Sequence, residues 1–359
     1  MKTGGLLVLL FFGGLLAMGQ GPLKVGVAGL THDHVRGLMD NYKKGNVIIL
    51  GIAESDAQLA QKYKQAYHLP DSLFFNSVLS MLEHIHPDVV LAYNAVSDHL
   101  AVVEACAPRG VSVMVEKPLV VTNKQADRIA ALADQYHILV LTNYETTWYA
   151  SNQQLYGMAH EQRAIGEIRR MVARAGHQGP KEIGCSADFL KWLTDPEKNG
   201  GGAIVDFGCY GADLMTWLMD GKAPIAVTAI TRHYKPEIYP KVDDDATLLL
   251  EYPGATGSIE ASWNWPYGIK DLEVFGQAGR LYAANGNSLE ERVKDSTVKV
   301  DLAPYAYADN LGYLAAVLRG EIHPVNDPSS LSVNRTVVAI LEAARLSAKE
   351  GKRVVISRE

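Results

Sequence analysis

The most informative stretch of this chain is Val111-Ser112-Val113-Met114-Val115-Glu116-Lys117-Pro118. Its first five residues predict a short buried strand. A carboxylate, an ammonium group and a proline follow where that strand ends, and ligands of open parallel sheets bind beyond the carboxyl ends of strands. Lys117 could exchange a proton with a substrate hydroxyl if burial or neighbouring groups lower its pKa. Taken alone, however, the tripeptide favours a solvated turn in which Pro118 ends the strand.

Short apolar runs alternate with helix-like segments on both sides of this stretch. The runs predict further strands at residues 23–28, 47–53, 88–92 and 138–141. Ser55, Asn76 and Thr122 are expected to cap helices, and Thr122 begins a capping box that ends at Gln125. Strands that alternate with helices predict an α/β fold, with a doubly wound parallel sheet over residues 22–142.

The turn after the first strand, Gly29-Leu30-Thr31-His32-Asp33-His34, matches a dinucleotide-binding turn only in part. Gly29 can supply the tight turn, but Thr31 and His34 occupy the second and third glycine positions of the G-x-G-x-x-G pattern. Asp33 adds a negative charge where a phosphate would face the helix N-terminus. His32 and His34 are not expected to bind a metal, because residues i and i+2 do not share a helical face.

An acidic residue, Glu54, follows the second predicted strand. An acid at this place can accept hydrogen bonds from both ribose hydroxyls of an adenosine, which favours NAD over NADP. The alternative is an ordinary acid in the first turn of a helix.

The pattern changes after residue 142. A long strand is predicted at residues 165–174, and strand patterns joined by turns continue over residues 224–284. Two helices are expected to close the chain, and the last of them could pack back on the first domain. Residues 143–359 therefore predict an α+β domain with a large, mostly antiparallel open sheet.

A helix predicted at residues 203–217 carries an unusual polar stripe. Asp206, Tyr210 and Asp213 stand at positions i, i+4 and i+7, which share one helical face. Gly202 and Gly208 lie beside them and allow another group to approach closely. Such a face suits a substrate site better than a core, although a capped, partly exposed helix is the alternative.

Charge and the N-terminal segment restrict the partners and the location. The formal net charge is −6 and basic residues are dispersed, so nucleic acid is not an expected partner. Residues 1–19 combine an early lysine, an apolar run and small residues at Ala17 and Gly19, which predicts a cleavable signal peptide. The chain is therefore expected to be exported, to the periplasm, without stable membrane insertion after cleavage. An uncleaved anchor is the alternative, but the run is short for a spanning helix.

Four motifs, in this order, resemble the glucose–fructose oxidoreductase/inositol dehydrogenase family, written Gfo/Idh/MocA. They are Asp98-His99, the run that ends in Glu116-Lys117-Pro118, the Gly200-Gly201-Gly202 run with Asp206-Phe207-Gly208-Cys209-Tyr210, and Val274-Phe275-Gly276. The resemblance covers nearly all of the chain after residue 19. It implies a Rossmann-type domain followed by a mixed sheet, a nicotinamide dinucleotide cofactor, and oxidation of sugars, polyols or related cyclic alcohols. It also implies a homo-oligomer formed through the open face of the second sheet.

The resemblance assigns roles to particular residues. Lys117 matches the catalytic lysine that shuttles the hydroxyl proton, Asp206 matches an acid that orients the substrate, and Glu116 matches a residue near the nicotinamide ribose. Tyr210 stands where many members carry histidine; it could donate a hydrogen bond, and a nearby Lys117 ammonium would lower its pKa. The full expected cofactor set is Gly29, Thr31, His32, Glu54, Asn94, His99, Glu116 and Asn143. The expected substrate residues are Tyr144, Trp148, Trp192 and Asp213, and no metal is expected.

Three functions follow as hypotheses. The first is an exported NAD(P)-dependent oxidoreductase that acts on a sugar, with NAD favoured and tightly held because free NAD is scarce outside the cytoplasm. The second is a glycosidase that oxidises a sugar hydroxyl transiently with NAD. The third is a carbohydrate-binding protein that keeps the fold without turnover.

Overall fold

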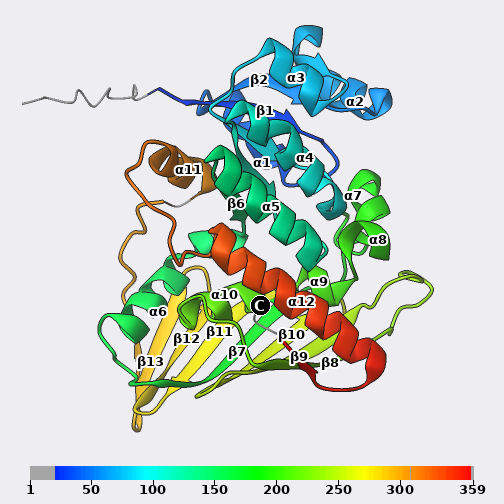
Figure 1. Cartoon of the computed structure of the whole chain (residues 1–359). Coiled ribbons are helices and arrows are strands. Elements are labelled where there is room, and N and C mark those ends of the chain that lie inside the picture. The colour runs from blue at the N-terminus through cyan, green and yellow to red at the C-terminus, as the bar shows by residue number, and fades with distance from the viewer. Residues whose placement is uncertain (1–20, 308, 357–359) are drawn as a thin grey trace, which may run out of the picture.

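A computed structural model describes residues 21–307 and 309–356. The predicted signal peptide, residues 1–19, lies outside these described residues. The chain forms two sheets, with the first above the second in Figure 1 and helices between them. Within the described residues, no helix has the length and apolar character needed to cross a membrane.

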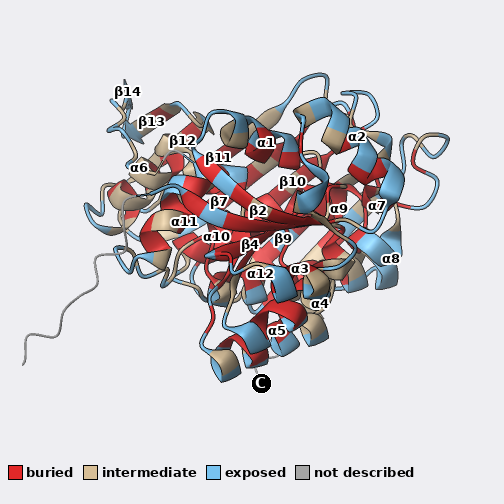
Figure 2. Ribbon diagram, turned by 90° about the horizontal axis from the view of Figure 1, so that it is seen from above, coloured by how far each residue is buried: buried red, intermediate tan, exposed pale blue. Residues whose placement is uncertain are grey.

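The first sheet contains six parallel strands in the order β3-β2-β1-β4-β5-β6. Its strands are rich in Val, Ile and Leu because helices cover both faces, and Figure 2 shows how completely the central strands are buried. The strands are β1 Leu23–Ala28, β2 Val47–Ala53, β3 Phe74–Phe75, β4 Val89–Ala92, β5 Ser112–Glu116 and β6 Val140–Asn143. The helices are α1 Val35–Lys43, α2 Ala57–Tyr67, α3 Val78–His84, α4 His99–Cys106 and α5 Asn123–Tyr136.

Helix caps in this domain were predicted with mixed success. Thr122 and Gln125 form the expected capping box at the start of α5. The caps of α2 and α3 are Asp56 and Ser77, whose side chains accept backbone N–H groups, so the predictions of Ser55 and Asn76 are each wrong by one residue. Ser, Asp and Asn are almost equivalent as caps, so sequence alone does not separate adjacent candidates.

The second sheet contains nine strands in the order β14-β13-β12-β11-β7-β10-β9-β8-β15. Its neighbours pair antiparallel except β7 and β10, so the predicted fold class, a parallel sheet followed by a mostly antiparallel one, is confirmed. The strands are β7 Ile168–Gly176, β8 Ala226–Arg232, β9 Asp245–Glu251, β10 Thr256–Ser262, β11 Ile269–Gly276, β12 Gly279–Asn285, β13 Ser288–Val293, β14 Ser296–Lys299 and β15 Val354–Val355. The helices are α6 Ala150–His160, α7 Ala187–Leu193, α8 Pro196–Asn199, α9 Ala203–Asp206, α10 Gly208–Leu218, α11 Asn310–Leu318 and α12 Leu331–Glu350.

The two closing helices join the domains. Leu311 and Tyr313 of α11 belong to the same apolar cluster as Leu23 and Val25 of β1, so packing places α11 in the first domain. The long helix α12 lies between the sheets in Figure 1, and its Val338 packs in the core of the first domain. Its other buried residues pack against α10 and the second sheet.

The glycine run before α9 has a structural cause. A Cβ on Gly202 would lie 1.7 Å from the backbone oxygen of Asp243, so only glycine fits there. Asp243 also accepts hydrogen bonds from the N–H groups of Gly202 and Ile204, at 2.9 and 2.7 Å. The group that approaches Gly202 is therefore backbone rather than substrate. The expectation of a close approach at Gly208 is wrong, since a Cβ added there would lie 3.6 Å from its nearest neighbour, a methyl group of Leu341.

Candidate active site

Lys117 lies at the carboxyl end of β5 and reaches across to the second domain. Its Nζ donates to Asp206 Oδ1 at 2.5 Å and to the Asp206 backbone oxygen at 2.9 Å. The other carboxylate oxygen of Asp206 accepts from Trp263 Nε1 at 2.9 Å. Lys117 and Asp206 are both 6% exposed, so the tripeptide is not a solvated turn but one half of a buried ion pair.

The ion pair sets the charge of both groups. Burial alone would lower the pKa of Lys117, but the Asp206 carboxylate outweighs burial and raises that pKa above its usual value. Burial alone would raise the pKa of Asp206, but Lys117 outweighs burial there too and lowers it. The condition set for proton exchange, a lowered Lys117 pKa, is therefore not met in the ligand-free protein, in which Lys117 is an ammonium ion.

Tyr210 lies between two lysines. The Nζ atoms of Lys117 and Lys270 are 5.0 and 4.6 Å from the centre of its ring. Burial raises the pKa of Tyr210 well above its usual value, and the Lys270 ammonium offsets only part of that rise. The lowering of this pKa expected from Lys117 is not among its main causes, burial prevails, and Tyr210 is a neutral phenol that can donate a hydrogen bond.

Two expected substrate residues lie beneath the site rather than in it. Tyr144 is fully buried and packs edge-on against Tyr210, with ring centroids 5.7 Å apart. Asp213 is also fully buried, and its carboxyl group forms no hydrogen bond with the described residues. Burial, and next the Asp327 carboxylate, raise the pKa of Asp213 well above its usual value, which favours the neutral acid in the core. Asp206 ends α9 while Tyr210 and Asp213 belong to α10, which buries Asp213 instead of presenting it.

A groove of about 470 Å³ runs past the carboxyl ends of β1, β2 and β4. Gly29, Thr31, Glu54 and Asn94 line it from the first domain, whereas α7 and α8 supply Lys191, Trp192 and Lys198. Trp192 therefore lines this groove, and its expected role in substrate binding stays a prediction. The volume is typical of a site for a cofactor-sized ligand.

The residues that line this groove are of the kinds that could hold the adenosine end of a dinucleotide. Gly29 has φ +79°, and a Cβ there would lie 2.7 Å from the Cβ of Asn94, so the tight turn needs glycine. Glu54 follows β2, and its carboxylate accepts from the N–H groups of Leu30 and Asp56, both at 2.9 Å. The Asn94 Oδ1 atom is buried and forms no hydrogen bond with any described residue. An acid and an unpaired amide oxygen in one groove suit ribose hydroxyl groups.

The phosphate turn offers fewer donors than a glycine-rich turn would. The N–H groups of Leu30, His32 and His34 are engaged by Glu54, by the Tyr93 oxygen and by His32 Nδ1. Lys191 and Lys198, which the sequence did not single out, bring positive charge to the same groove. These lysines could balance a pyrophosphate that the turn binds only weakly.

The remaining expected cofactor residues divide into two groups. His99 is fully buried, and its Nδ1 lies 2.9 Å from the Leu119 oxygen, so it holds the loop after Lys117 rather than facing the groove. Glu116 Oε1 accepts from Asn143 Nδ2 at 2.9 Å, and Asn143 Oδ1 accepts from Trp148 Nε1 at 3.1 Å. Trp148 thus holds the Asn143 side chain in place, and both residues line a second groove, which also contains Glu116.

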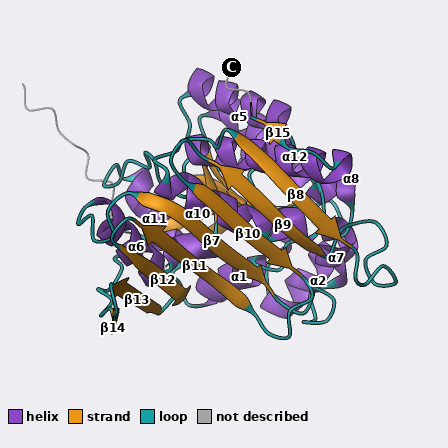
Figure 3. Cartoon of the chain, turned by 90° about the horizontal axis from the view of Figure 1, so that it is seen from below, coloured by secondary structure: helices purple, strands orange, loops and turns teal. Residues whose placement is uncertain are grey.

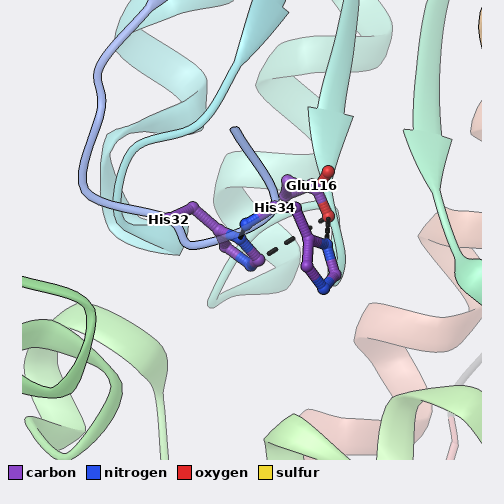
Figure 4. Close-up of side chains that lie close together, drawn as sticks. All are labelled: His32, His34 and Glu116. Carbon is purple, nitrogen blue, oxygen red and sulfur yellow. Dashed lines mark hydrogen bonds and ion pairs between the residues drawn. The ribbon is translucent and has the colours of Figure 1, made fainter. Parts of the chain in front are cut away.

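His32 and His34 contradict the argument from helical spacing. Both precede α1, in a turn, and Figure 4 shows their rings beside the Glu116 carboxylate. His34 Nδ1 lies 2.8 Å from Glu116 Oε2, and His32 Nε2 lies 4.0 Å from the same atom. Spacing i, i+2 separates side chains in a helix but not in a turn.

Comparison with known families matches both domains. Residues 23–144 match the oxidoreductase family with an NAD-binding Rossmann fold, and residues 158–282 match the GFO/IDH/MocA C-terminal domain. The chain belongs to the Gfo/Idh/MocA oxidoreductase family.

Its similarity to individual members is more distant. It is 24% identical over 215 residues to trans-1,2-dihydrobenzene-1,2-diol dehydrogenase of Xenopus tropicalis, an alignment that spans 60% of each chain. The human protein of that name is 24% identical over 237 residues, which is 65% of this chain and 66% of the relative. The chain thus spans less than two thirds of the length of these relatives.

Solved structures of the family share the fold. An inositol dehydrogenase homolog complexed with NAD+ from Azotobacter vinelandii has a TM-score of 0.80 at 17% identity, over 94% of this chain and 98% of that one. Aldose-aldose oxidoreductase from Caulobacter crescentus, complexed with glycerol, has a TM-score of 0.78 at 19% identity, over 93% and 99%.

Two residues of this family member's site escaped sequence reasoning. Lys270 of β11 is paired with Glu145 and faces Tyr210. His177 follows β7, and its ring packs edge-on against Phe207, with centroids 4.8 Å apart. Its Nδ1 accepts from the Gly179 N–H at 2.9 Å, so the proton of the neutral ring is on Nε2. A polar residue three positions after the strand predicted at 165–174 was the available signal for His177, which directly follows β7; Lys270 had none.

Proposed function

We propose that this protein is an NAD(P)-dependent oxidoreductase that moves a hydride between the nicotinamide and a hydroxyl-bearing carbon of a sugar, polyol or sugar derivative. The observation that carries the proposal is the buried Lys117–Asp206 pair, 2.5 Å apart, at the end of β5. It lies in a fold whose first domain belongs to an NAD-binding family. When bound, the nicotinamide would supply the hydride acceptor or donor.

The residues of the chain would bind the cofactor and move the proton. Gly29, Thr31, Glu54 and Asn94 would hold the adenosine half, with Lys191 opposite. In carbonyl reduction, the Lys117 ammonium donates a proton to the substrate oxygen, and Asp206 stabilises the charge before transfer. In alcohol oxidation, the neutral Lys117 amine accepts the hydroxyl proton. Tyr210 donates a hydrogen bond to the same oxygen.

A sugar-type substrate is the finer part of this proposal. Lys117, Tyr210, Lys270 and His177 offer several hydrogen-bond donors close together, as recognition of a polyhydroxylated ring requires. NAD rather than NADP is favoured because the Glu54 carboxylate would repel a 2′-phosphate. Export, as expected from residues 1–19, stays a prediction.

Oligomerisation through the second sheet is a further part of the proposal. Figure 3 shows the face of this sheet that lies opposite α10 and α12. Ile230 of β8 and Leu249 of β9 are 54% and 49% exposed there. Large apolar side chains on an uncovered sheet favour contact with a second copy.

The test is NADH formation from NAD with a panel of aldoses, polyols and uronic acids. Wild type is expected to oxidise at least one of them, and Lys117→Ala should lose about 100-fold or more of that activity. Lys124→Ala, at the exposed start of α5, is the control. Activity that survives in Lys117→Ala would overturn the proposed role. Release of nitrophenol from nitrophenyl glycosides without net NADH would instead support a glycosidase.

A further inference from the structure

The turn before α1 and the end of β5 bring three metal-ligating side chains together. His32 Nε2, His34 Nδ1 and Glu116 Oε2 all lie within 4.8 Å of one another. Figure 4 shows both imidazole rings turned toward the Glu116 carboxylate. Two histidines and one glutamate are a ligand set of catalytic zinc sites.

One of these ligand atoms is unsatisfied. His32 is 2% exposed, and its Nε2 atom forms no hydrogen bond with any described residue. It lies 4.0 Å from Glu116 Oε2, which is too far for a hydrogen bond. A buried polar atom without a partner is costly, so its presence points to a group that the protein alone does not provide.

The surroundings orient two of the ligands. Glu116 Oε1 is occupied by Asn143 Nδ2, which leaves Oε2 directed toward the histidines. The His32 ring packs against Phe189 and Trp192, with centroids 4.7 and 5.6 Å away. Hydrogen-bonded partners such as Asn143 fix the direction of metal ligands in proteins, and the two aromatic rings restrict the His32 ring by packing.

A route to the site is open. His34 has a side chain that is 47% exposed, and with Glu116 it lines a groove of about 270 Å³. Asn143, Glu145 and Trp148 line the same groove. Three protein ligands beside an accessible space leave a coordination position for water or for an oxygen of a ligand.

We propose that His32, His34 and Glu116 bind one divalent transition-metal ion, with Zn²⁺ the best match to two imidazoles and a carboxylate. The ligand atoms are Nε2, Nδ1 and Oε2. The site lies beside Lys117, because Glu116 precedes it in the chain. His34 and Glu116 also line the groove, so the ion would polarise an oxygen atom of a ligand bound in that groove. Binding of this ion can be measured without the dinucleotide, so its test is separate from that of hydride transfer.

Metal binding requires two local changes. The 2.8 Å hydrogen bond between His34 Nδ1 and Glu116 Oε2 gives way to two metal–ligand bonds of about 2.0–2.2 Å. His32 Nδ1 faces the His34 N–H at 3.2 Å, so the metal-free ring carries its proton on Nε2. When Nε2 binds the metal, the ring proton is on Nδ1. Nδ1 can then no longer accept from the His34 N–H, so this hydrogen bond breaks. Both changes lie within the turn and leave β5 in place.

The experiment is calorimetric titration of tag-free, chelator-treated protein with ZnCl₂, without dinucleotide. Wild type is expected to bind one Zn²⁺ per chain. His34→Ala and Glu116→Gln should each weaken Zn²⁺ binding by about 100-fold or more. Removal of a residue that only supports a ligand costs about 10- to 100-fold in metal affinity, and removal of the ligand itself should cost at least as much. His84→Ala, a histidine on α3 outside the cluster, should bind like wild type.

Cobalt provides a second measurement. Co²⁺ bound by wild type should give the visible absorption of a low-coordinate site, and His34→Ala should lose it. His34 is exposed, so this variant should fold, which a thermal melt checks. Absence of Zn²⁺ binding in wild type, or equal binding in wild type and His34→Ala, would overturn the proposal. The three side chains would then be a hydrogen-bonded group only, whatever the outcome of the NAD experiments.

Discussion

At the residue scale, Lys117 shows what a sequence can and cannot reveal. Its place after an apolar run predicted the end of a buried strand, because parallel strands are buried on both faces. Its charge state could not be predicted, since Asp206, its partner at 2.5 Å, stands 89 residues further along the chain. Burial and pairing act on the pKa of Lys117 in opposite directions, and only the structure shows that pairing prevails.

The ion pair predicts a stability effect. Asp206→Asn leaves a buried ammonium without its counter-charge, so the free energy of unfolding should fall by about 3–5 kcal/mol. The double variant Lys117→Met/Asp206→Asn should recover much of that loss, because it buries no charge. Urea denaturation measures both values. Glu104→Gln, from an exposed pair with Arg128, is the control and should change stability by about 1 kcal/mol or less. An equally small effect of Asp206→Asn would contradict the buried pair.

The same pair predicts a pH dependence of activity. Alcohol oxidation needs neutral Lys117, whose pKa lies above its usual value. The neutral fraction therefore increases as pH rises, and the oxidation rate should increase about tenfold per pH unit from about pH 7 to about pH 10. Carbonyl reduction, which needs the ammonium, should stay level over this range. Initial rates in both directions give the test; an oxidation rate that levels off near neutral pH would identify a different base.

At the element scale, periodicity predicted elements well but not their interruptions. The helix expected over residues 203–217 is two helices, α9 and α10, with Phe207 between them. Asp243, from the turn before β9, binds the N–H groups at the start of α9, and its backbone lies against Gly202. Glycine at position 202 predicted that another group approaches closely. The sequence could not show that this group is Asp243, which lies 41 residues further along the chain.

Gly202 and Gly208 make a matched pair for this element. Gly202→Ala places a methyl group against the Asp243 backbone and should destabilise the protein by about 3 kcal/mol. Gly208→Ala meets no atom closer than 3.6 Å and should change stability by about 1 kcal/mol or less. Thermal unfolding of the two variants gives the comparison. Equal stability of both would show that the Asp243 contact does not constrain Gly202.

At the scale of the whole molecule, the two-domain α/β architecture was predictable and the packing between its parts was not. The order of strand and helix patterns predicted a parallel sheet followed by a mostly antiparallel one, as found. However, α11 shares an apolar cluster with β1, and Lys270 of β11 reaches Tyr210 of α10. These contacts join segments far apart in the chain, and one sequence carries no signal for them.

The open face of the second sheet predicts self-association. Wild type should elute as an oligomer in size-exclusion chromatography with light scattering, because Ile230 and Leu249 expose apolar surface on this face. Leu249→Lys should shift the protein toward a monomer through the burial of an unpaired charge. Leu79→Lys, at a 50% exposed leucine of α3, is the control and should leave the mass unchanged. A monomeric wild type would contradict this part of the proposal.

The account depends most directly on whether the groove beside β1 and β2 binds a nicotinamide dinucleotide. The measurement is calorimetric titration of NAD and NADP into the purified protein, with mass spectrometry of the denatured protein to detect retained cofactor. NAD should bind one per chain and more tightly than NADP. Glu54→Ala should weaken NAD by about 10-fold or more and reduce the difference between the two cofactors. If neither dinucleotide binds and none is released on denaturation, the oxidoreductase assignment is contradicted.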